Sequence, residues 1–512
     1  MKKHFLANTL MLTLTSQLLR VAGIFMTAYL TSRIGAEGVG LYQLILSVYS
    51  LAAVLASSGI GSTVARLIAE SLGKSGGKSV SDVLRRAIFV SVALGIVTGA
   101  AVYLLADFFG TSLLSDARAV PAIRMLAAGL PFMALSSCMQ GYFFGVRKAM
   151  QPSAQMLFEQ AVRIGLTVAV LDMFIARGLA ASCFAIILCC MISEALSCAF
   201  AFLLYAIHVR RSRIAVRHEA DIGRQMLRIA APLALTGYLR AALRTAENIL
   251  IPSGLRAYGA TEARALSQYA QVGMAAMVLF FPSGLLGAAA TLLMPEVSEA
   301  RAAKRTPQVH RIFSRTFQFT VLYSLLISAL LLSLGQPLGS ALFPNTEAGQ
   351  LIAALAPLVP LMYLDFVVDS LLTGLGEQMR TLRINTVDYA IRITLILLLI
   401  PRLGFVAYVV VVYVSTLFNA VLSIRRLLIA SGCRVRYPEW VLGPLLCAAI
   451  AGVAASLLQK LLLPGMDIAG ALLKAGLMTG LYFALLRVTR CLTREDVAWV
   501  IGIVRRKPAR ES

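Results

Sequence analysis

Long runs of apolar residues recur along nearly the whole chain, from Phe5 to Arg487. Most approach the roughly 20 residues that an α-helix needs to cross about 30 Å of hydrocarbon. The period-two alternation of β-strands does not occur in them. A transmembrane β-barrel would require that alternation, because barrels and helices are the structures that satisfy their backbone polar groups inside a bilayer. The pattern therefore predicts an all-α integral membrane protein.

The apolar runs divide into about fourteen predicted transmembrane helices. They cover residues 5–30, 39–60, 87–106, 119–145, 153–175, 179–207, 228–251, 268–293, 316–335, 349–372, 384–400, 405–424, 441–459 and 469–486. Composition supports this reading, because 59% of the residues are hydrophobic and 14% are charged, whereas soluble domains are about 45–50% apolar. The first run follows Lys2 and Lys3 as a signal peptide would, but Arg20 interrupts it, so we expect it to be retained.

Charge predicts the orientation of these helices. The chain has 47 Lys and Arg against 24 Asp and Glu, a formal net charge of +23. Dense basic segments lie at residues 66–86, 210–228, 301–315, 425–436 and 505–507. With the N-terminus inside, all of them are cytoplasmic, as the positive-inside rule requires. We therefore expect a multi-pass protein of the cytoplasmic membrane with both termini inside, with membrane lipids and not nucleic acid as its partners.

The sequence gives little support for a metal site or a catalytic site. The eight cysteines lie in predicted spans or on the cytoplasmic side, so no disulfide framework is predicted. The four histidines are scattered without the spacing of metal ligands. The predicted loops are short and lack a cluster of His, Asp or Glu. We predict no metal site, no catalytic residues and no enzyme activity.

The chain contains an internal repeat, in which Pro131–Leu166 overlies Pro360–Leu395 without gaps. The matched positions include Gly145 with Gly374, Arg163 with Arg392 and, conservatively, Glu159 with Asp388. Each repeat has six spans, and because this number is even both repeats enter the membrane in the same direction. We therefore expect an axis along the membrane normal to relate the two halves. We predict a six-helix lobe at residues 1–210, a second at 211–430, and two further helices with a basic cytoplasmic tail at 431–512.

Three segments, Gly35–Gln43, Ser58–Arg66 and Met294–Glu299, resemble those of a known family. The chain is similar to the polysaccharide-transporter branch of the multidrug/oligosaccharidyl-lipid/polysaccharide (MOP) flippase superfamily. That superfamily includes the lipid II flippases and the multidrug and toxic compound extrusion (MATE) exporters. The resemblance implies two six-helix lobes that alternate between inward-open and outward-open states, and a role in spore formation.

Charged residues inside predicted spans are the candidate functional residues, because each costs about 2.5–3.5 kcal/mol at mid-bilayer on insertion scales. Glu159 with Arg163, and Asp388 with Arg392, are acid and base four residues apart on one helix face. They occupy matching places in the two halves. We interpret them chiefly as structural ion pairs.

Arg20, Arg240 and Arg244 are the candidate substrate-binding residues. A lipid-linked sugar carries a pyrophosphate, and guanidinium groups bind phosphate oxygens through paired charge-assisted hydrogen bonds. Two alternatives stay open: Arg244 neutralises Glu247, or Arg20 pairs with an acid elsewhere. The resemblance implies cavity arginines on the first span, but also on the second and eighth spans, where this chain has none.

Transport also needs a driving force. Glu247, Asn385 and Asp388 supply oxygen ligands that resemble the cation site of some relatives. Asp365 and Asp369, one turn apart, form a rival site. The alternative for Asp388 is its ion pair alone. We predict no resident cofactor, with Na⁺ or H⁺ as the candidate coupling ion.

The predicted function is a flippase that moves a lipid-linked cell-wall or polysaccharide precursor, of undecaprenyl-pyrophosphate or lipid II type, by alternating access. A cation-coupled multidrug exporter is the first alternative, although a cavity for cations should be lined by carboxylates and aromatic rings. A scaffold for envelope synthesis that transports nothing is the second. The oligomeric state does not follow from the sequence.

Overall fold

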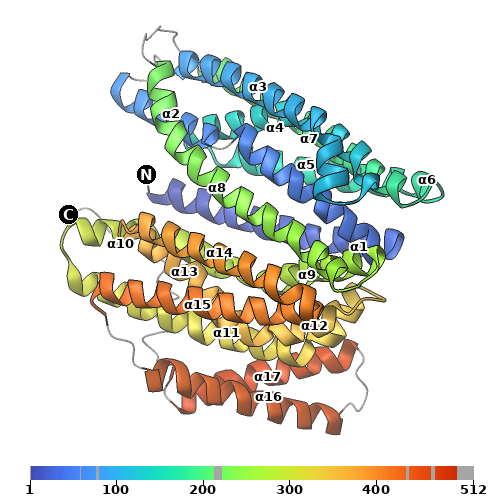
Figure 1. The fold of residues 1–512 in the computed structure, drawn as a ribbon. Helices are drawn as coiled ribbons and strands as arrows, with labels where there is room; N and C mark the ends of the chain where they lie inside the picture. The colour runs from blue at the N-terminus through green and yellow to red at the C-terminus, as the bar shows by residue number, and fades with distance from the viewer. Residues whose placement is uncertain are drawn as a thin grey trace. The chain divides into compact units, whose positions relative to one another are not determined.

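The computed structural model describes residues 2–57, 59–75, 80–212, 222–433, 437–462, 468–489 and 491–492. Within those ranges the chain forms helices and connecting turns, and no β-strand occurs (Figure 1). This confirms the predicted all-α fold. His218, the basic tail at residues 505–507 and parts of the basic segments 66–86, 210–228 and 425–436 lie outside the described residues.

The chain separates into two compact units. The N-terminal unit consists of Leu10–Ala270 and Ile396–Gly404, and the C-terminal unit of Met1–Thr9, Gln271–Leu395 and Phe405–Ser512. In chain order the helices are α1 (Lys2–Ser57), α2 (Ile60–Ser75), α3 (Val80–Leu104), η1 (Phe108–Leu113), η2 (Ala117–Ala119), α4 (Val120–Gly145), α5 (Met150–Val170), α6 (Asp172–Ile175), α7 (Leu179–Ser212), α8 (Ile222–Ala257), α9 (Glu262–Phe280), α10 (Gly284–Ala302), α11 (Thr306–Leu342), α12 (Ala348–Leu355), η3 (Ala356–Leu358), α13 (Val359–Gly374), α14 (Gln378–Leu403), α15 (Phe405–Ser431), η4 (Pro438–Leu442), α16 (Gly443–Leu462) and α17 (Ile468–Val488). The predicted boundaries at residues 210 and 430 stay predictions.

Ten helical segments of the described chain are long and apolar enough to cross a membrane. The first, Met11–Leu72, covers the predicted span 39–60 and most of the predicted span 5–30. A chain with several such segments is a multi-pass membrane protein. The predicted number of about fourteen spans stays a prediction.

The first two predicted spans join at a kink inside α1. Gly35 there has φ 70° and ψ 175°, which is not helical. Residues with a Cβ rarely adopt this left-handed region, whereas glycine does so without strain. The chain therefore changes direction at the glycine that begins the first resembling segment.

Two predicted spans of the C-terminal unit are interrupted. The turn Phe281–Ser283 separates α9 from α10, and the 3-10 turn Ala356–Leu358 separates α12 from α13. Proline removes a backbone donor at each turn and frees nearby carbonyl groups. The Tyr323 hydroxyl donates to the Pro282 carbonyl at 2.9 Å, and the Ser328 hydroxyl donates to the Ala356 carbonyl at 2.8 Å. Side chains thus satisfy polar groups that hydrocarbon would leave unbonded.

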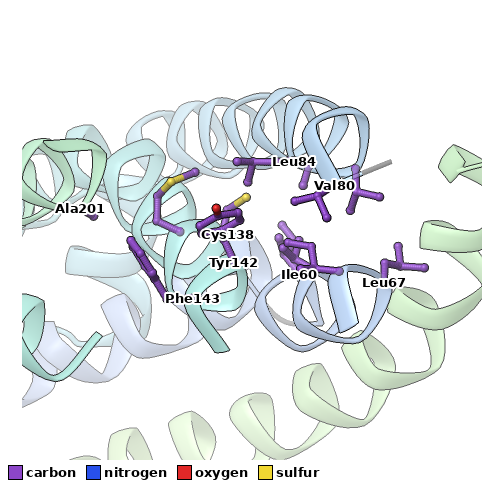
Figure 2. Packing of buried hydrophobic residues seen from close by; sticks show 13 residues of the cluster. Ile60, Leu67, Val80, Leu84, Cys138, Tyr142, Phe143 and Ala201 are labelled. Carbon is purple, nitrogen blue, oxygen red and sulfur yellow. The ribbon is translucent and has the colours of Figure 1, made fainter. Parts of the chain in front are cut away.

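The N-terminal unit has an apolar cluster where α2, α3, α4 and α7 meet (Figure 2). Its labelled members are Ile60, Leu67, Val80, Leu84, Cys138, Tyr142, Phe143 and Ala201. The Tyr142 hydroxyl lies 3.2 Å from Nδ1 of His208, so the phenol keeps a polar partner inside the cluster. Inside a bilayer the hydrophobic effect does not drive helices together, so close packing of large and small side chains holds these helices in contact.

One arginine ties three segments of the N-terminal unit together. Arg118, next to η2, contacts Glu37 at 2.9 Å, Asp116 at 2.8 Å and Glu262 at 2.8 Å. The Asp116 side chain is 2% exposed. Burial by itself would raise the pKa of the Asp116 carboxyl, but hydrogen bonds from Arg118 hold it below its usual range. This cluster connects the end of the α1 kink, the loop before α4 and the start of α9.

We expect Arg118→Ala to lower the melting temperature of the purified protein in detergent. Removing the guanidinium leaves a buried carboxylate unmatched, and hydrogen bonds to charged groups contribute about 1.5–3 kcal/mol each. Arg124→Ala is the matched control, since its 2.6 Å pair with Asp107 is 45% and 64% exposed and such pairs contribute about 0–1 kcal/mol. Equal decreases in melting temperature in the two variants would contradict the role given to Arg118.

Candidate functional site

A cluster of carboxylates and amides lies among three helices of the C-terminal unit. Asp365 and Asp369 are on α13, Asn385 on α14 and Asn419 on α15. The Asn385 amide donates to Oδ2 of Asp369 at 3.1 Å. The Asn419 amide donates to Oδ2 of Asp365 at 3.1 Å and to Oδ1 of Asn385 at 3.3 Å. We call these four residues the amide–carboxylate cluster.

The amide–carboxylate cluster contains oxygen atoms that could hold a small cation or a proton. Oδ1 of Asp365 is buried and has no hydrogen-bond partner among the described residues. The four side chains offer oxygen atoms from three different helices, and hard cations prefer oxygen ligands. A proton would serve equally, because two carboxylates one turn apart in a poorly hydrated site disfavour a double negative charge. Within the described residues no group of three or more His, Cys, Asp or Glu is placed to hold a metal.

Asp388, one of the predicted coupling residues, is already bonded on both oxygens. Arg392 contacts its Oδ2 at 3.2 Å, and the Ser415 hydroxyl donates to its Oδ1 at 2.6 Å. Arg392 also donates to Ser415 at 2.8 Å. These bonds hold the carboxylate in a closed triad of acid, base and hydroxyl, separate from the hydrogen bonds of the amide–carboxylate cluster.

The N-terminal unit contains the matching pair. Glu159 and Arg163 on α5 form an ion pair, and two serines of α7 surround it. The Ser197 hydroxyl donates to Oε2 of Glu159 at 3.3 Å, and Arg163 donates to Ser193 at 3.5 Å. Both repeats therefore place an acid, a base four residues later and a hydroxyl from a neighbouring helix together.

The predicted substrate arginines belong to the N-terminal unit. Arg20 lies on α1, and Arg240 and Arg244 lie one turn apart on α8. All three side chains are exposed. In the part of the chain that the structure describes, neither Arg240 nor Arg244 has an ion pair or a hydrogen bond to a side chain. The structure describes no contact between Arg20 and either of the two α8 arginines.

Glu247, three residues after Arg244, is buried at 7% exposure. Polar groups of α1 and α9 surround this stretch of α8. The Asn248 amide donates to the Ser47 hydroxyl at 3.0 Å, and that hydroxyl lies 3.3 Å from the Tyr269 hydroxyl. Thr245 donates to the Ser47 carbonyl at 3.2 Å. Asn385 and Asp388 belong to the other unit, so the predicted grouping of Glu247 with them stays a prediction.

Sequence reasoning missed Asn419, Ser415 and the Ser47–Asn248 contact. Asn419 could have been selected from the sequence, because it is the only amide side chain in the predicted span 405–424. Polar side chains inside spans usually have a functional or structural partner. The serines carry little signal, since a serine hydroxyl often bonds the backbone of its own helix.

Comparison with known proteins identifies the family. The family model described as "Polysaccharide biosynthesis protein" matches residues 5–300, and the MatE model matches residues 255–398. The chain is 21% identical over 407 residues to stage V sporulation protein B of Bacillus subtilis (strain 168), covering 78% of this chain and 79% of that protein.

Solved structures give the same fold. The lipid II flippase MurJ in an inward closed conformation superposes with a TM-score of 0.71 at 11% identity, covering 93% of this chain and 98% of that one. An inward-facing MATE family multidrug resistance transporter of the MOP superfamily gives a TM-score of 0.63 at 15% identity, covering 82% and 96%. The matched families and structures are transporters and flippases, not enzymes. The chain therefore belongs to the polysaccharide biosynthesis protein family and has the fold of MOP superfamily transporters and flippases.

Proposed function

We propose that this transporter flips a lipid-linked cell-envelope precursor, of the undecaprenyl-pyrophosphate or lipid II type, across the cytoplasmic membrane by alternating access. Both termini lie in the cytoplasm in this proposal. A flippase whose relatives include a sporulation protein suits the building of a spore envelope, so we include that role. Every cargo of this class carries an anionic pyrophosphate, and we propose the class because arginines can bind that group.

One contrast among the intramembrane arginines carries the proposal. Arg163 and Arg392 each contact an acid on their own helix and a serine on another. Arg240 and Arg244 are exposed and make no such ion pair or serine hydrogen bond with a described residue. A guanidinium in a predicted span requires compensation by water, lipid phosphate or a ligand. An exposed arginine pair that makes no ion pair with a described acid is suited to an anionic cargo.

The amide–carboxylate cluster is the proposed coupling site for Na⁺ or H⁺. Its carboxylates lie on α13 and its amides on α14 and α15, so binding depends on how these three helices are arranged. A ligand shifts an equilibrium between two states only when it binds them with different affinity. Helices that move against one another during transport would give the ion that difference.

The MatE model over residues 255–398 supports a second candidate, a cation-coupled multidrug exporter. The amide–carboxylate cluster would then bind the cationic drug itself. Efflux of a cationic dye that competes with the coupling ion would favour this function. Flipping of the lipid precursor without dye transport would exclude it.

We expect Arg240→Gln plus Arg244→Gln to lower the initial rate of flipping at least about tenfold, since each charge-assisted contact to phosphate contributes about 1.5–3 kcal/mol. The assay follows fluorescent lipid II and a simpler undecaprenyl-pyrophosphate sugar in liposomes containing purified protein. Arg20→Gln tests the third arginine separately.

The control for this assay is Arg177→Gln plus Arg264→Gln, which removes two other exposed positive charges. We expect this control pair to flip at the wild-type rate. Equal rates in the α8 variant and the control pair would reject the arginine site. A wild type that flips neither lipid would favour the exporter or a scaffold.

We expect Asp365→Asn to abolish the dependence of transport on Na⁺ or pH, because it removes the negative charge of a carboxylate whose Oδ1 has no hydrogen-bond partner among the described residues. Asp388→Asn should keep that dependence and instead lower the melting temperature, since its oxygens bond Arg392 and Ser415. The measurement is flipping under an imposed Na⁺ or proton gradient. Loss of coupling in Asp388→Asn alone would place the ion there.

A further inference from the structure

The N-terminal unit has an apolar groove of about 680 Å³ where α4 packs against α3 and α7 (Figure 1). Its apolar lining includes Ile96, Ala100, Leu104, Met125, Ala128 and Phe184. Ile96, Ala100 and Ala128 are exposed, so the groove opens on the surface of the unit. The three helices are long and apolar enough to cross a membrane. An apolar groove along such helices is suited to a hydrocarbon chain.

The groove has the depth of one leaflet of a bilayer. On α4 its lining positions run from Pro121 to Pro131, which is a rise of about 15 Å along the helix axis. The hydrocarbon core of a bilayer is about 30 Å thick, so each leaflet supplies about half of it. A Cβ at Gly99 would lie 2.7 Å from the Ala127 carbonyl oxygen, so the two backbones approach closely at the groove. The groove is therefore a fixed feature of how α3 and α4 pack.

A pair of opposite charges lies at one end of this groove. Arg124, in the second turn of α4, lines the groove, whereas Asp107 follows the end of α3 and lies outside the lining. Their side chains form an ion pair at 2.6 Å, and they are 45% and 64% exposed. The Arg124 guanidinium lies over the Tyr103 ring, 5.9 Å from its centroid. From the groove outward, the protein thus presents an apolar surface, then a positive charge, then a negative charge.

Arg124 can bind a second anion while it keeps its contact with Asp107. A guanidinium has several N–H donors in a planar fork, and this fork matches phosphate oxygens. The hydrogen bond from Arg124 to Asp107 uses one of these donors. The exposed Asp107 carboxylate can in turn accept a hydrogen bond from an ammonium group. A ligand that satisfies both residues has a phosphate next to a primary ammonium.

We propose that this groove binds phosphatidylethanolamine, with an acyl chain along α3 and α4, the phosphate on Arg124 and the ammonium on Asp107. The order of acyl chain, phosphate and ammonium in that lipid matches the order of apolar surface, positive charge and negative charge in the protein. In the orientation proposed above, this end of the groove faces outward, so the lipid belongs to the outer leaflet. The binding itself does not depend on that orientation.

The negative charge of Asp107 distinguishes phosphatidylethanolamine from other lipids. Phosphatidylglycerol and a pyrophosphate-linked cargo are anionic and have no ammonium, so the carboxylate would repel them. Phosphatidylcholine has a positive headgroup, but its quaternary nitrogen has no N–H to donate to the carboxylate. Every residue that lines the groove belongs to the N-terminal unit. The proposed site is thus independent of the cargo and of the coupling ion proposed above.

Native mass spectrometry of the purified full chain tests this directly. Dioleoyl phosphatidylethanolamine, phosphatidylcholine and phosphatidylglycerol are titrated separately into the protein in a neutral detergent. We expect phosphatidylethanolamine to bind at least about fivefold more tightly than the other two, because only its ammonium donates a charge-assisted hydrogen bond to Asp107. Equal affinities for phosphatidylethanolamine and phosphatidylcholine would overturn the proposal.

Exchange of the two charges, Arg124→Asp plus Asp107→Arg, keeps an ion pair at this place but reverses its order. We expect the exchange to abolish the preference for phosphatidylethanolamine and to leave the melting temperature in lipid-free detergent unchanged. Asp107→Asn alone should abolish the preference over phosphatidylcholine, and Arg124→Gln alone should weaken all three lipids. A wild-type preference in the exchanged variant or in Asp107→Asn would refute the headgroup site.

A second exposed ion pair of the same unit provides the matched control. Arg33 and Asp172 lie 3.5 Å apart and are 47% and 53% exposed, and the Arg33 guanidinium lies 5.5 Å from the centroid of the Tyr29 ring. This pair has the same three chemical groups, but none of them lines the groove. Arg33→Asp plus Asp172→Arg should therefore keep the wild-type preference. Loss of the preference in this control would contradict the assignment to Arg124 and Asp107.

The apolar part of the site is tested by Ala128→Phe. Ala128 lines the groove and is exposed, so a phenyl ring there occupies the space proposed for the acyl chain. We expect this variant to bind phosphatidylethanolamine more weakly while Arg124 and Asp107 stay in place. An unchanged affinity would refute the groove as the site of the acyl chain. Displacement of phosphatidylethanolamine by lower concentrations of undecaprenyl pyrophosphate would also overturn the proposal, because it would assign the groove to the cargo.

Discussion

A charge or an unbonded polar group inside the hydrocarbon of a bilayer must meet an opposite charge, a hydrogen-bond partner or water. The structure satisfies this constraint in several ways. Arg163 and Arg392 meet an acid on their own helix. Asp365 and Asp369 accept amide hydrogen bonds instead. The charged side chains left without such compensation are the ones to which a ligand can be assigned.

The same constraint acts on the backbone. Helices break at Phe281–Ser283 and Ala356–Leu358, and the hydroxyls of Tyr323 and Ser328 bond the carbonyl groups at those breaks. Irregular backbone at membrane depth is tolerated where protein groups satisfy it. Both breaks lie in the C-terminal unit, which also contains the amide–carboxylate cluster. Broken helices and an ion site commonly occur together in transporters.

The two repeats share an acid–base pair at matching positions but differ in their other polar side chains. The acid–base pairs Glu159–Arg163 and Asp388–Arg392 occupy matching positions, and each has serine partners from a neighbouring helix. The amide–carboxylate cluster has no such counterpart. At the positions that match Asp365, Asp369 and Asn385, the first repeat has Ser136, Gln140 and Met156. The duplicated pair therefore serves the architecture of both halves, while the unduplicated acids are suited to a task that only one half performs.

The sequence by itself determined the all-α membrane fold and the family, because long apolar runs and internal repeats are properties of local composition and order. It also predicted the partners within each i, i+4 pair, since one helix face brings them together. Tertiary structure alone decided that Asn419 reaches Asp365 and that Ser415 closes the triad of Asp388. These contacts join helices distant along the chain, and a periodic pattern contains no information about which helix faces which.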